Sequence, residues 1–264
     1  MKILAEADGD VFLPNPAPLR PVEYVFVCME PSLGRWAHSA NEARSKIEAG
    51  FQNFISSIED FILHFCIQEY LCEPTQRYHI TDLSKGAMMV ERAGVARSER
   101  YDRWYGLLLE ELDLVATKKA GIFAVGNVVA QHLERRIFPR PFAKVIHYSG
   151  QAARARSAGI AGREDSFEEF RSSVSLERVL ATAEGVLVTS GAGPSFRDET
   201  LARLAKSQLS KSRQQLIFNY KLAFEAMRQR GRTSLSSQAV SNATHGFRCA
   251  ERPSNERCSC QRIF

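Results

Sequence analysis

The chain has 264 residues, 44% hydrophobic and 25% charged, which suffices for one core of ordinary size and an appendage. It contains no run of eighteen apolar residues and no charged-then-apolar leader, so we expect neither a membrane protein nor a secreted one. Its six cysteines are scattered, and Cys28, Cys66 and Cys72 have the apolar neighbours of reduced thiols, which favours a cytoplasmic location.

Charge is distributed unevenly along the chain. Residues 1 to 150 hold 17 Lys and Arg against 19 Asp and Glu, whereas residues 151 to 264 hold 18 against 11. A basic half beside a neutral one is common in proteins that bind polyanions, although basic tails without such a ligand show it too. Charge alone therefore leaves nucleic-acid binding open.

The first third of the chain predicts two strands that end in polar residues. Residues 1 to 21 contain four prolines and predict an extended lead-in without a helix. The run YVFVC, residues 24 to 28, predicts a buried strand that breaks at Glu30-Pro31. An amphipathic helix is expected over about 54 to 65, and then a second strand over 77 to 83.

The middle of the chain continues this alternation. Ser98 is expected to cap a helix that Lys118, Lys119 and Gly121 close. A third strand, GIFAV, runs into Gly126 and a helix, and a fourth spans 143 to 147. Strands and helices at these intervals predict a three-layer α/β/α fold with a four-stranded, mostly parallel sheet.

The C-terminal part predicts helices and then loss of order. One helix is expected over about 167 to 180, and a longer one with a basic, solvated or phosphate-binding face from about 195 to 229. Beyond Gly231 periodicity is lost, which predicts a disordered tail. The predicted domains are 1–185, the α/β/α domain; 186–230, a basic helical extension; and 231–264, the tail.

Taken together, the strand ends resemble the uracil-DNA glycosylase superfamily over about residues 20 to 185. An acid-proline turn at Glu30 follows the first strand, and TDLSKG stands where the family commonly has a strand ending in Thr-Asn and a Lys. A strand runs into Gly126, and His147-Tyr148-Ser149 stands where the family has His-Pro-Ser. The resemblance implies a divergent branch of that superfamily.

This resemblance implies a DNA glycosylase with Glu30 and His147 at its centre. Cleaving an N-glycosidic bond builds positive charge on the sugar and negative charge on the departing base, so the site needs a carboxylate and a hydrogen-bond donor. Glu30 would stabilise the cation or orient the attacking water, and His147 would donate to the base oxygen O2. The structural alternatives are a solvated loop acid and a histidine that bonds a backbone carbonyl.

Two departures from the family pattern bear on the substrate. Asp82 stands where the uracil enzymes read the base with Asn, and an ionised carboxylate would repel O4 of uracil but accept from the amine of cytosine. Ser32 replaces a Tyr that blocks substituents on ring carbon five. Because removing ordinary cytosine would destroy the host genome, we infer a hydroxymethylated or sugar-bearing cytosine of phage DNA. Alternatively, Asp82 pairs with Lys85 or Arg77 as ordinary structure.

The remaining site predictions concern stacking and DNA contact. Phe51, after Gly50, stands at about the interval of the family's stacking Phe, although a core role is equally compatible. The Leu that often enters the duplex is absent. Predicted contacts to DNA are Ser149, Gln151, Arg154, Arg156 and Lys85.

No cofactor or metal is expected. The four-cysteine set of the iron-sulfur members is missing, and His245, Cys249, Cys258 and Cys260 fit no standard zinc spacing. Other hypotheses are a repair glycosylase for uracil or a deaminated base, and an inactive DNA-binding protein of the same fold. A nucleotide-binding protein is disfavoured because no glycine-rich phosphate loop follows any predicted strand.

Overall fold

The computed structural model describes the backbone of residues 1–34, 36–149 and 152–245, and side chains as far as residue 229. The chain divides into two compact units, Met1–Glu225 and Ala226–Phe264. The first unit holds the sheet and the cleft described below. Within the described helices, none combines the length and the apolar character that crossing a membrane requires.

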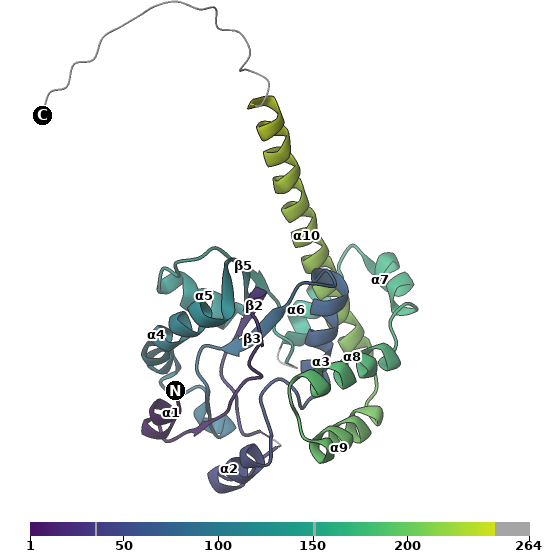
Figure 1. The fold of residues 1–264 in the computed structure, drawn as a ribbon. Helices are drawn as coiled ribbons and strands as arrows, with labels where there is room; N and C mark the ends of the chain where they lie inside the picture. The colour runs from purple at the N-terminus through teal and green to yellow at the C-terminus, as the bar shows by residue number, and fades with distance from the viewer. Residues whose placement is uncertain (35, 150–151, 246–264) are drawn as a thin grey trace, which may run out of the picture. The chain divides into compact units, whose positions relative to one another are not determined.

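Four parallel strands form the central sheet (Figure 1). They are β2 (Val22–Cys28), β3 (Tyr78–Asp82), β5 (Ala116–Val125) and β6 (Phe142–Val145), in the order β3-β2-β5-β6. The register pairs Cys28 with Asp82 and Val125 with Val145, so the carboxyl ends of all four strands meet at one edge. The predicted α/β class and four-stranded sheet are confirmed, and the sheet is parallel throughout.

Helices α4 (Arg97–Val115) and α5 (Asn127–Arg135) cover one face of this sheet (Figure 1). Their buried side chains form one cluster with the inward residues of β2 and β5, including Tyr101, Leu108, Leu133, Val25 and Ile122. Burial of each large apolar side chain is worth roughly 1.5–3 kcal/mol, so this cluster holds the two helices firmly on the sheet.

The other face is covered by α3 (Ile58–Cys66) and by the first part of α10 (Lys211–His245). The ring of Phe26 stacks on Phe123 at 4.6 Å, and Phe224 of α10 meets both rings edge-on at 5.6 Å. A capping box at Ser57 begins α3, and a π-helical turn, η1 (Ile67–Leu71), extends it. The central sheet therefore lies between two helical layers, as predicted.

The N-terminal prediction is wrong in one respect. Residues Lys2–Ala7 form helix α1, and β1 (Val11–Phe12) pairs antiparallel with β4 (Gly86–Ala87). The prolines begin only at Pro14, so nothing prevents the preceding residues from forming a helix.

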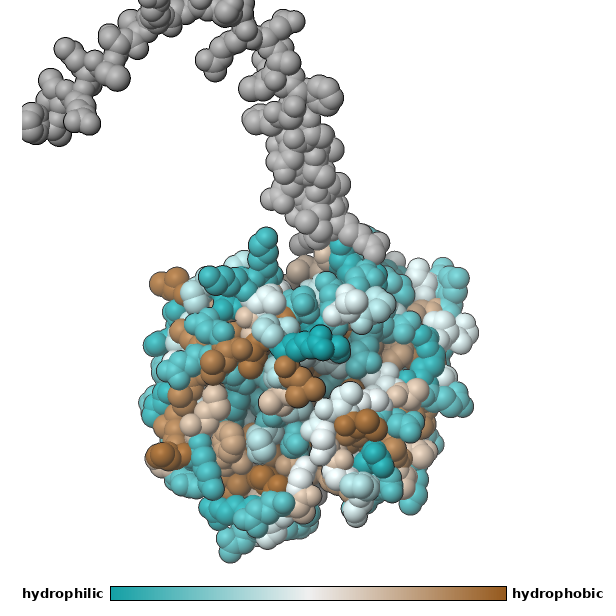
Figure 2. All heavy atoms as spheres, viewed as in Figure 1, coloured by the Kyte–Doolittle hydropathy of each residue, from teal (hydrophilic) through white to brown (hydrophobic). Residues whose placement is uncertain are grey.

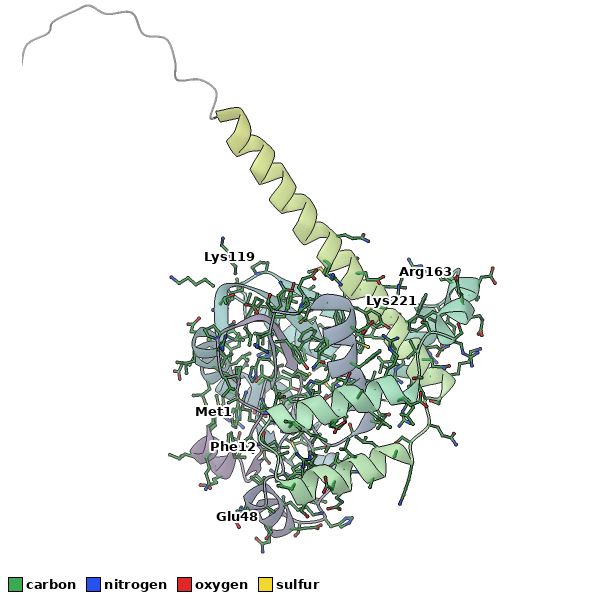
Figure 3. All side chains as sticks on the ribbon, turned by 45° about the vertical axis from the view of Figure 1, so that its right-hand side comes forward. Met1, Phe12, Glu48, Lys119, Arg163 and Lys221 are labelled. Carbon is green, nitrogen blue, oxygen red and sulfur yellow. The ribbon has the colours of Figure 1, made fainter. Side chains whose placement is uncertain are left out.

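The ends of α4 also differ from the prediction. Ala96, in a left-handed conformation, is the N-cap, and Ser98 lies inside the first turn. Lys118 and Lys119 do not close the helix but lie exposed in β5, which starts at Ala116 and pairs with β2 there. Figure 3 shows Lys119 at the periphery. The two lysines predict a helix end, but the pairing of β5 with β2 places them in a strand instead.

The remaining helices are α2 (Ala40–Glu48), η2 (Val90–Arg92), α6 (Ala153–Ala158), α7 (Glu164–Arg171), α8 (Leu176–Thr189) and α9 (Pro194–Ala205). The helix predicted over 167 to 180 is thus two helices, α7 and α8, and the one predicted over 195 to 229 is also two, α9 and α10.

Helix α10 runs to His245, against the predicted loss of order from Gly231, and residues 246–264 lie outside the described part. The unit Met1–Glu225 crosses the predicted domain boundary at 185.

Candidate functional site

A cleft of about 950 Å³ opens at the carboxyl edge of the sheet. Its wall includes the last residue of β3 and residues that follow β2 and β6, with others from the segment before α3. The site residues used below that line it are Glu30, Ser32, Phe51, Asn53, Asp60, Asp82, Val90, Arg97, His147 and Ser149. This edge is where open α/β sheets bind ligands, and the volume is at the upper end of the roughly 300–1,000 Å³ typical of small-molecule pockets.

His147 lies two residues after β6 and lines this cleft. Its Nδ1 accepts a hydrogen bond from the backbone N–H of Ser149 at 3.0 Å. Burial, aided by the charge of Arg156, lowers the pKa of His147 to about 4. The ring is therefore neutral at pH 7 and carries its proton on Nε2, which makes Nε2 a hydrogen-bond donor.

Gly126 makes room for this imidazole. Its φ is +96°, and its N–H donates to the carbonyl of Val145 at 2.8 Å. A Cβ at this position would lie 3.2 Å from the Cβ and 3.3 Å from the Cδ2 of His147. The glycine between β5 and α5 thus permits the close packing of this cleft-lining histidine against the backbone.

Glu30 is a buried, ion-paired carboxylate, not a solvated loop acid. Its side chain is 3% exposed, with Oε1 at 2.8 Å from Nη2 of Arg97 and 4.0 Å from that of Arg100. The hydroxyl of Tyr101 donates to Oε2. Burial raises the pKa of Glu30, and the two arginines oppose that rise. Glu30 therefore also fixes Arg97 at the cleft.

Asp82, at the end of β3, is 3% exposed, and its Oδ2 accepts a hydrogen bond from Nδ2 of Asn53 at 2.6 Å. The amide of Asn53 is oriented because its Oδ1 accepts from the N–H of Phe54 at 3.1 Å. Burial raises the pKa of Asp82 well above its usual value, and the neighbouring acids add to this against the charge of Lys85. These surroundings favour the protonated carboxyl over the ionised acceptor that the sequence predicts.

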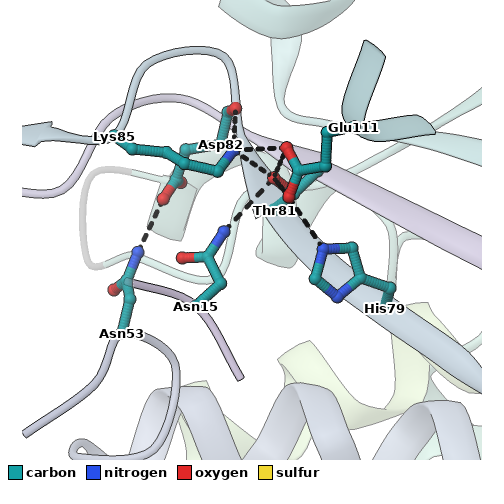
Figure 4. A network of polar contacts seen from close by, with 7 residues as sticks. All are labelled: Asn15, Asn53, His79, Thr81, Asp82, Lys85 and Glu111. Atoms are coloured by element: carbon teal, nitrogen blue, oxygen red, sulfur yellow. Dashed lines mark hydrogen bonds and ion pairs between the residues drawn. The ribbon is translucent and has the colours of Figure 1, made fainter. Parts of the chain in front are cut away.

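Lys85, predicted as a DNA contact, is buried in a network of polar side chains (Figure 4). Its Nζ lies 2.5 Å from Glu111 and 2.6 Å from the hydroxyl of Thr81, and reaches only the backbone oxygen of Asp82, at 3.4 Å. Burial would raise the pKa of Glu111, but the bond from His79 and the charge of Lys85 lower it to about 2. Because Glu111 holds Lys85 in the interior, this side chain lacks the exposure that the predicted DNA contact requires.

Arg156 is also buried and is not available to DNA. Its guanidinium donates to the carbonyls of Tyr148 and Ser149 and to the hydroxyl of Ser212 at 3.1 Å. It therefore ties the loop after His147 to α10. Of the other predicted contacts, Ser149 lines the cleft and Arg154 is exposed on α6. Gln151 lies outside the described residues.

Phe51 and Ser32 both line the cleft, as a base-binding role would require. The ring of Phe51 stacks on Trp36 at 4.3 Å and meets Phe196 edge-on at 5.7 Å. The carbonyl of Ser32 accepts from Nε1 of Trp36 at 2.7 Å. Trp36 thus links the two predicted residues, and one face of the Phe51 ring is already occupied.

Asn53, Asp60 and Arg97 are cleft residues that the sequence prediction misses. Asp60 caps α3 by accepting from the N–H of Ser57 at 2.8 Å, and burial raises its pKa. The sequence does mark Asp60 as part of a capping box, but a capping box predicts the start of a helix and not a functional site. Nothing local in the sequence joins Asn53 to Asp82.

Comparison with known proteins identifies no relative. No protein-family model matches the chain, and no match was found among curated proteins or solved structures. Among the residues that the structure describes, no group of three or more His, Cys, Asp and Glu is arranged to hold a metal ion.

Proposed function

We propose that this protein is a DNA glycosylase that hydrolyses the N-glycosidic bond of a modified pyrimidine flipped into the cleft. The substrate we propose is a cytosine that carries a hydroxymethyl or glucosyl group, as in foreign DNA. The observation that supports this is that Glu30 and His147, each two residues after the end of a different strand, β2 and β6, line one cleft with room for a nucleotide.

The chemistry divides between these two residues. As the bond between C1′ and N1 lengthens, Nε2–H of the neutral His147 donates to the base oxygen O2, where negative charge develops. The Glu30 carboxylate faces the opposite charge, on the sugar. Because Arg97 and Arg100 offset part of its charge, we expect Glu30 to orient the attacking water and to position Arg97 near a phosphate.

Contacts to the DNA backbone come from residues that remain accessible. The side chain of Arg97 is 31% exposed, and Arg154 is exposed on α6. Val90, in η2, lines the cleft and is 57% exposed, so this loop offers an apolar side chain to fill the space of a flipped nucleotide. On the face in Figure 2, apolar side chains lie among hydrophilic ones.

One observation favours a second candidate, a glycosylase for uracil. The sequence argument against uracil assumes an ionised Asp82, but burial raises the pKa of this carboxyl. A protonated carboxyl donates to O4 of uracil as readily as it accepts from an amine. Asp82 by itself therefore does not exclude uracil.

The test is a base-release assay. Duplexes carrying uracil, cytosine, 5-hydroxymethylcytosine or glucosylated 5-hydroxymethylcytosine are incubated with the protein, and abasic sites are detected by alkaline cleavage. We expect release of a modified cytosine, loss of about a hundredfold or more in rate for His147→Ala, and no change for Lys119→Ala on the far part of β5. Release of uracil alone would support the second candidate. DNA binding without release of any base would contradict both.

A further inference from the structure

Asp82 is a buried carboxyl without a cationic partner among the described residues. No Lys, Arg or His nitrogen there lies within ion-pair distance of its side chain, although the group is 3% exposed. Glu30, also in the cleft, has Arg97 at 2.8 Å. Isolated carboxylates are costly to bury, so a group in this position holds its proton.

Lys85 is the cation best placed to neutralise an ionised Asp82, but its ammonium group binds Glu111 and Thr81 instead. Its ammonium lies 2.5 Å from Oε2 of Glu111 and 2.6 Å from the hydroxyl of Thr81 (Figure 4). Its contact with Asp82 is to the backbone carbonyl and not to the side-chain carboxyl. Glu111 pairs with the Lys85 ammonium and remains ionised. Asp82 has no such partner and is therefore the neutral acid of the two.

Asn53 determines which oxygen of Asp82 carries the proton. Because the Asn53 amide oxygen accepts from the N–H of Phe54, its nitrogen is the group that faces Asp82 and donates to Oδ2 at 2.6 Å. Oδ2 is therefore the carbonyl-like oxygen and Oδ1 the hydroxyl. No hydrogen bond from Oδ1 to another described residue is present, and Asp82 lines the cleft.

A carboxyl with one donor and one acceptor matches the edge of cytosine. The Oδ1 hydroxyl can donate to the ring nitrogen N3, while Oδ2 accepts from the N4 amine. An acid that pairs with N3 can also give up its proton there. Protonation of N3 makes cytosine a better leaving group, because the base then departs without a negative charge.

We propose that Asp82 is the general acid of the reaction, which protonates N3 of the flipped cytosine as the glycosidic bond breaks. This inference rests on the proposed glycosylase function. The electron pair of the bond between C1′ and N1 stays on the base, the Asp82 proton moves to N3, and cytosine leaves neutral. Water adds to C1′, and the proton that it releases restores the Asp82 carboxyl.

The test compares Asp82→Asn with wild type on duplexes containing 5-hydroxymethylcytosine. Asn keeps one donor and one acceptor of similar shape but cannot transfer a proton. We expect the single-turnover rate to fall about a hundredfold or more, while the Kd measured by fluorescence anisotropy changes by less than about threefold. Asp165→Asn, an exposed acid on α7, is the matched control with no expected change.

The pH profile provides a second readout that does not depend on the folding of a variant. The wild-type rate should fall as pH rises through the ionisation of Asp82. The titratable and charged groups around it are Cys28 and Glu30 from β2 and its turn, Asp60 of α3, Lys85, Glu111 of α4, and His147 and Tyr148 after β6. Asp82→Asn should lack this descending limb.

The outcomes separate the two proposals. A wild-type enzyme that releases the modified cytosine equally well at high pH, or an Asp82→Asn variant within about threefold of wild type in rate, overturns the acid role alone. No base release from any duplex overturns the glycosylase function and the acid role with it. Release of uracil alone also overturns the acid role as stated, because it assigns the proton to N3 of cytosine.

Discussion

Nδ2 of Asn53 donates to Oδ2 of Asp82 at 2.6 Å across a sequence separation of 29 residues. The bond joins the segment before α3 to the end of β3. It also orients the carboxyl group and thereby fixes where Oδ1 lies. Under the proposed function, base recognition would thus depend on Asn53, a residue that takes no part in the bonds being broken.

Asn53→Leu should therefore reduce base release while leaving the protein folded. Loss of the amide removes the donor to Asp82, and we expect a rate about tenfold to a hundredfold lower, with a destabilisation of about 1–3 kcal/mol from the unpaired carboxyl. Single-turnover assays and urea unfolding measure the two effects. Asn41→Leu, on the surface of α2, is the control. Equal rates for wild type and Asn53→Leu would show that the orientation of Asp82 is unimportant.

Gly126→Ala should damage the site more than the fold. The added Cβ would stand 3.2 Å from the Cβ of His147, and the φ of +96° is unfavourable for alanine. We expect a loss of about 1–2 kcal/mol in stability and at least a tenfold loss in base release. Gly162→Ala, which also has positive φ but no neighbour within 4 Å, controls for backbone strain. Similar activity losses in both variants would contradict a positioning role for Gly126.

Lys85→Met should be strongly destabilising, because it leaves Glu111 ionised and buried without its cation. We expect a loss of about 3–5 kcal/mol in the free energy of unfolding, measured in urea. The double variant Lys85→Met with Glu111→Gln should recover part of that loss. If Lys85→Met instead kept full stability and only weakened DNA binding, the buried network would not have the structural role inferred here.

Stability should fall as pH drops below about 6.5, with His64 as a main contributor. Its ring bonds the Tyr78 hydroxyl at 2.7 Å and the Phe54 carbonyl at 2.9 Å, and burial lowers its pKa to about 4. Between pH 6.5 and 4 the unfolded chain binds a proton that the folded chain does not, so acidification favours unfolding. His64→Gln should reduce the loss between pH 7 and pH 4 by about 3 kcal/mol. Urea unfolding at both pH values measures it, and an unchanged pH dependence in the variant would contradict the assignment.

Arg154→Ala should weaken DNA binding without changing the chemistry. The side chain is exposed, whereas Arg156 is buried against the loop after His147. Removing one phosphate contact should lower the slope of log affinity against log salt by about 1. Anisotropy titrations at several salt concentrations measure that slope, with Arg44→Ala on α2 as the control. A slope unchanged in Arg154→Ala would remove this residue from the interface.

Much of the sheet could be predicted because its strands carry their own signals. Runs of β-branched and aromatic residues locate β2, β3 and β5, and parallel pairing then brings Glu30, Asp82 and His147 to one edge. The alternation of strands and helices is a local pattern, and connection rules leave few topologies for it. The sequence therefore predicts that these three residues lie at the same edge of the sheet, whereas the cleft that they share depends on the strand order and on the packing of the loops.

The partners of charged residues could not be predicted in the same way. Lys85 and Arg156 have the sequence surroundings of surface residues, yet Glu111 and two loop carbonyls hold them inside. Those partners lie on other elements and become neighbours only after the sheet and helices pack. The raised pKa of Asp82 has the same origin, since it comes from burial and from the way the packed elements place Lys85 next to Glu111.

The loop that carries His147 takes its support from the far end of the folded unit. The hydroxyl of Tyr220 donates to the carbonyl of Ile146 at 2.9 Å, and Ser212 accepts from Arg156 at 3.1 Å. A fragment cut at residue 185 would keep all four strands but lose both of these anchors, so the loop after β6 would keep only contacts from within the first 185 residues, such as the bonds from Arg156 to the carbonyls of Tyr148 and Ser149. A piece that keeps both anchors must extend through Tyr220, so the first part of α10 belongs to the same compact unit as the cleft.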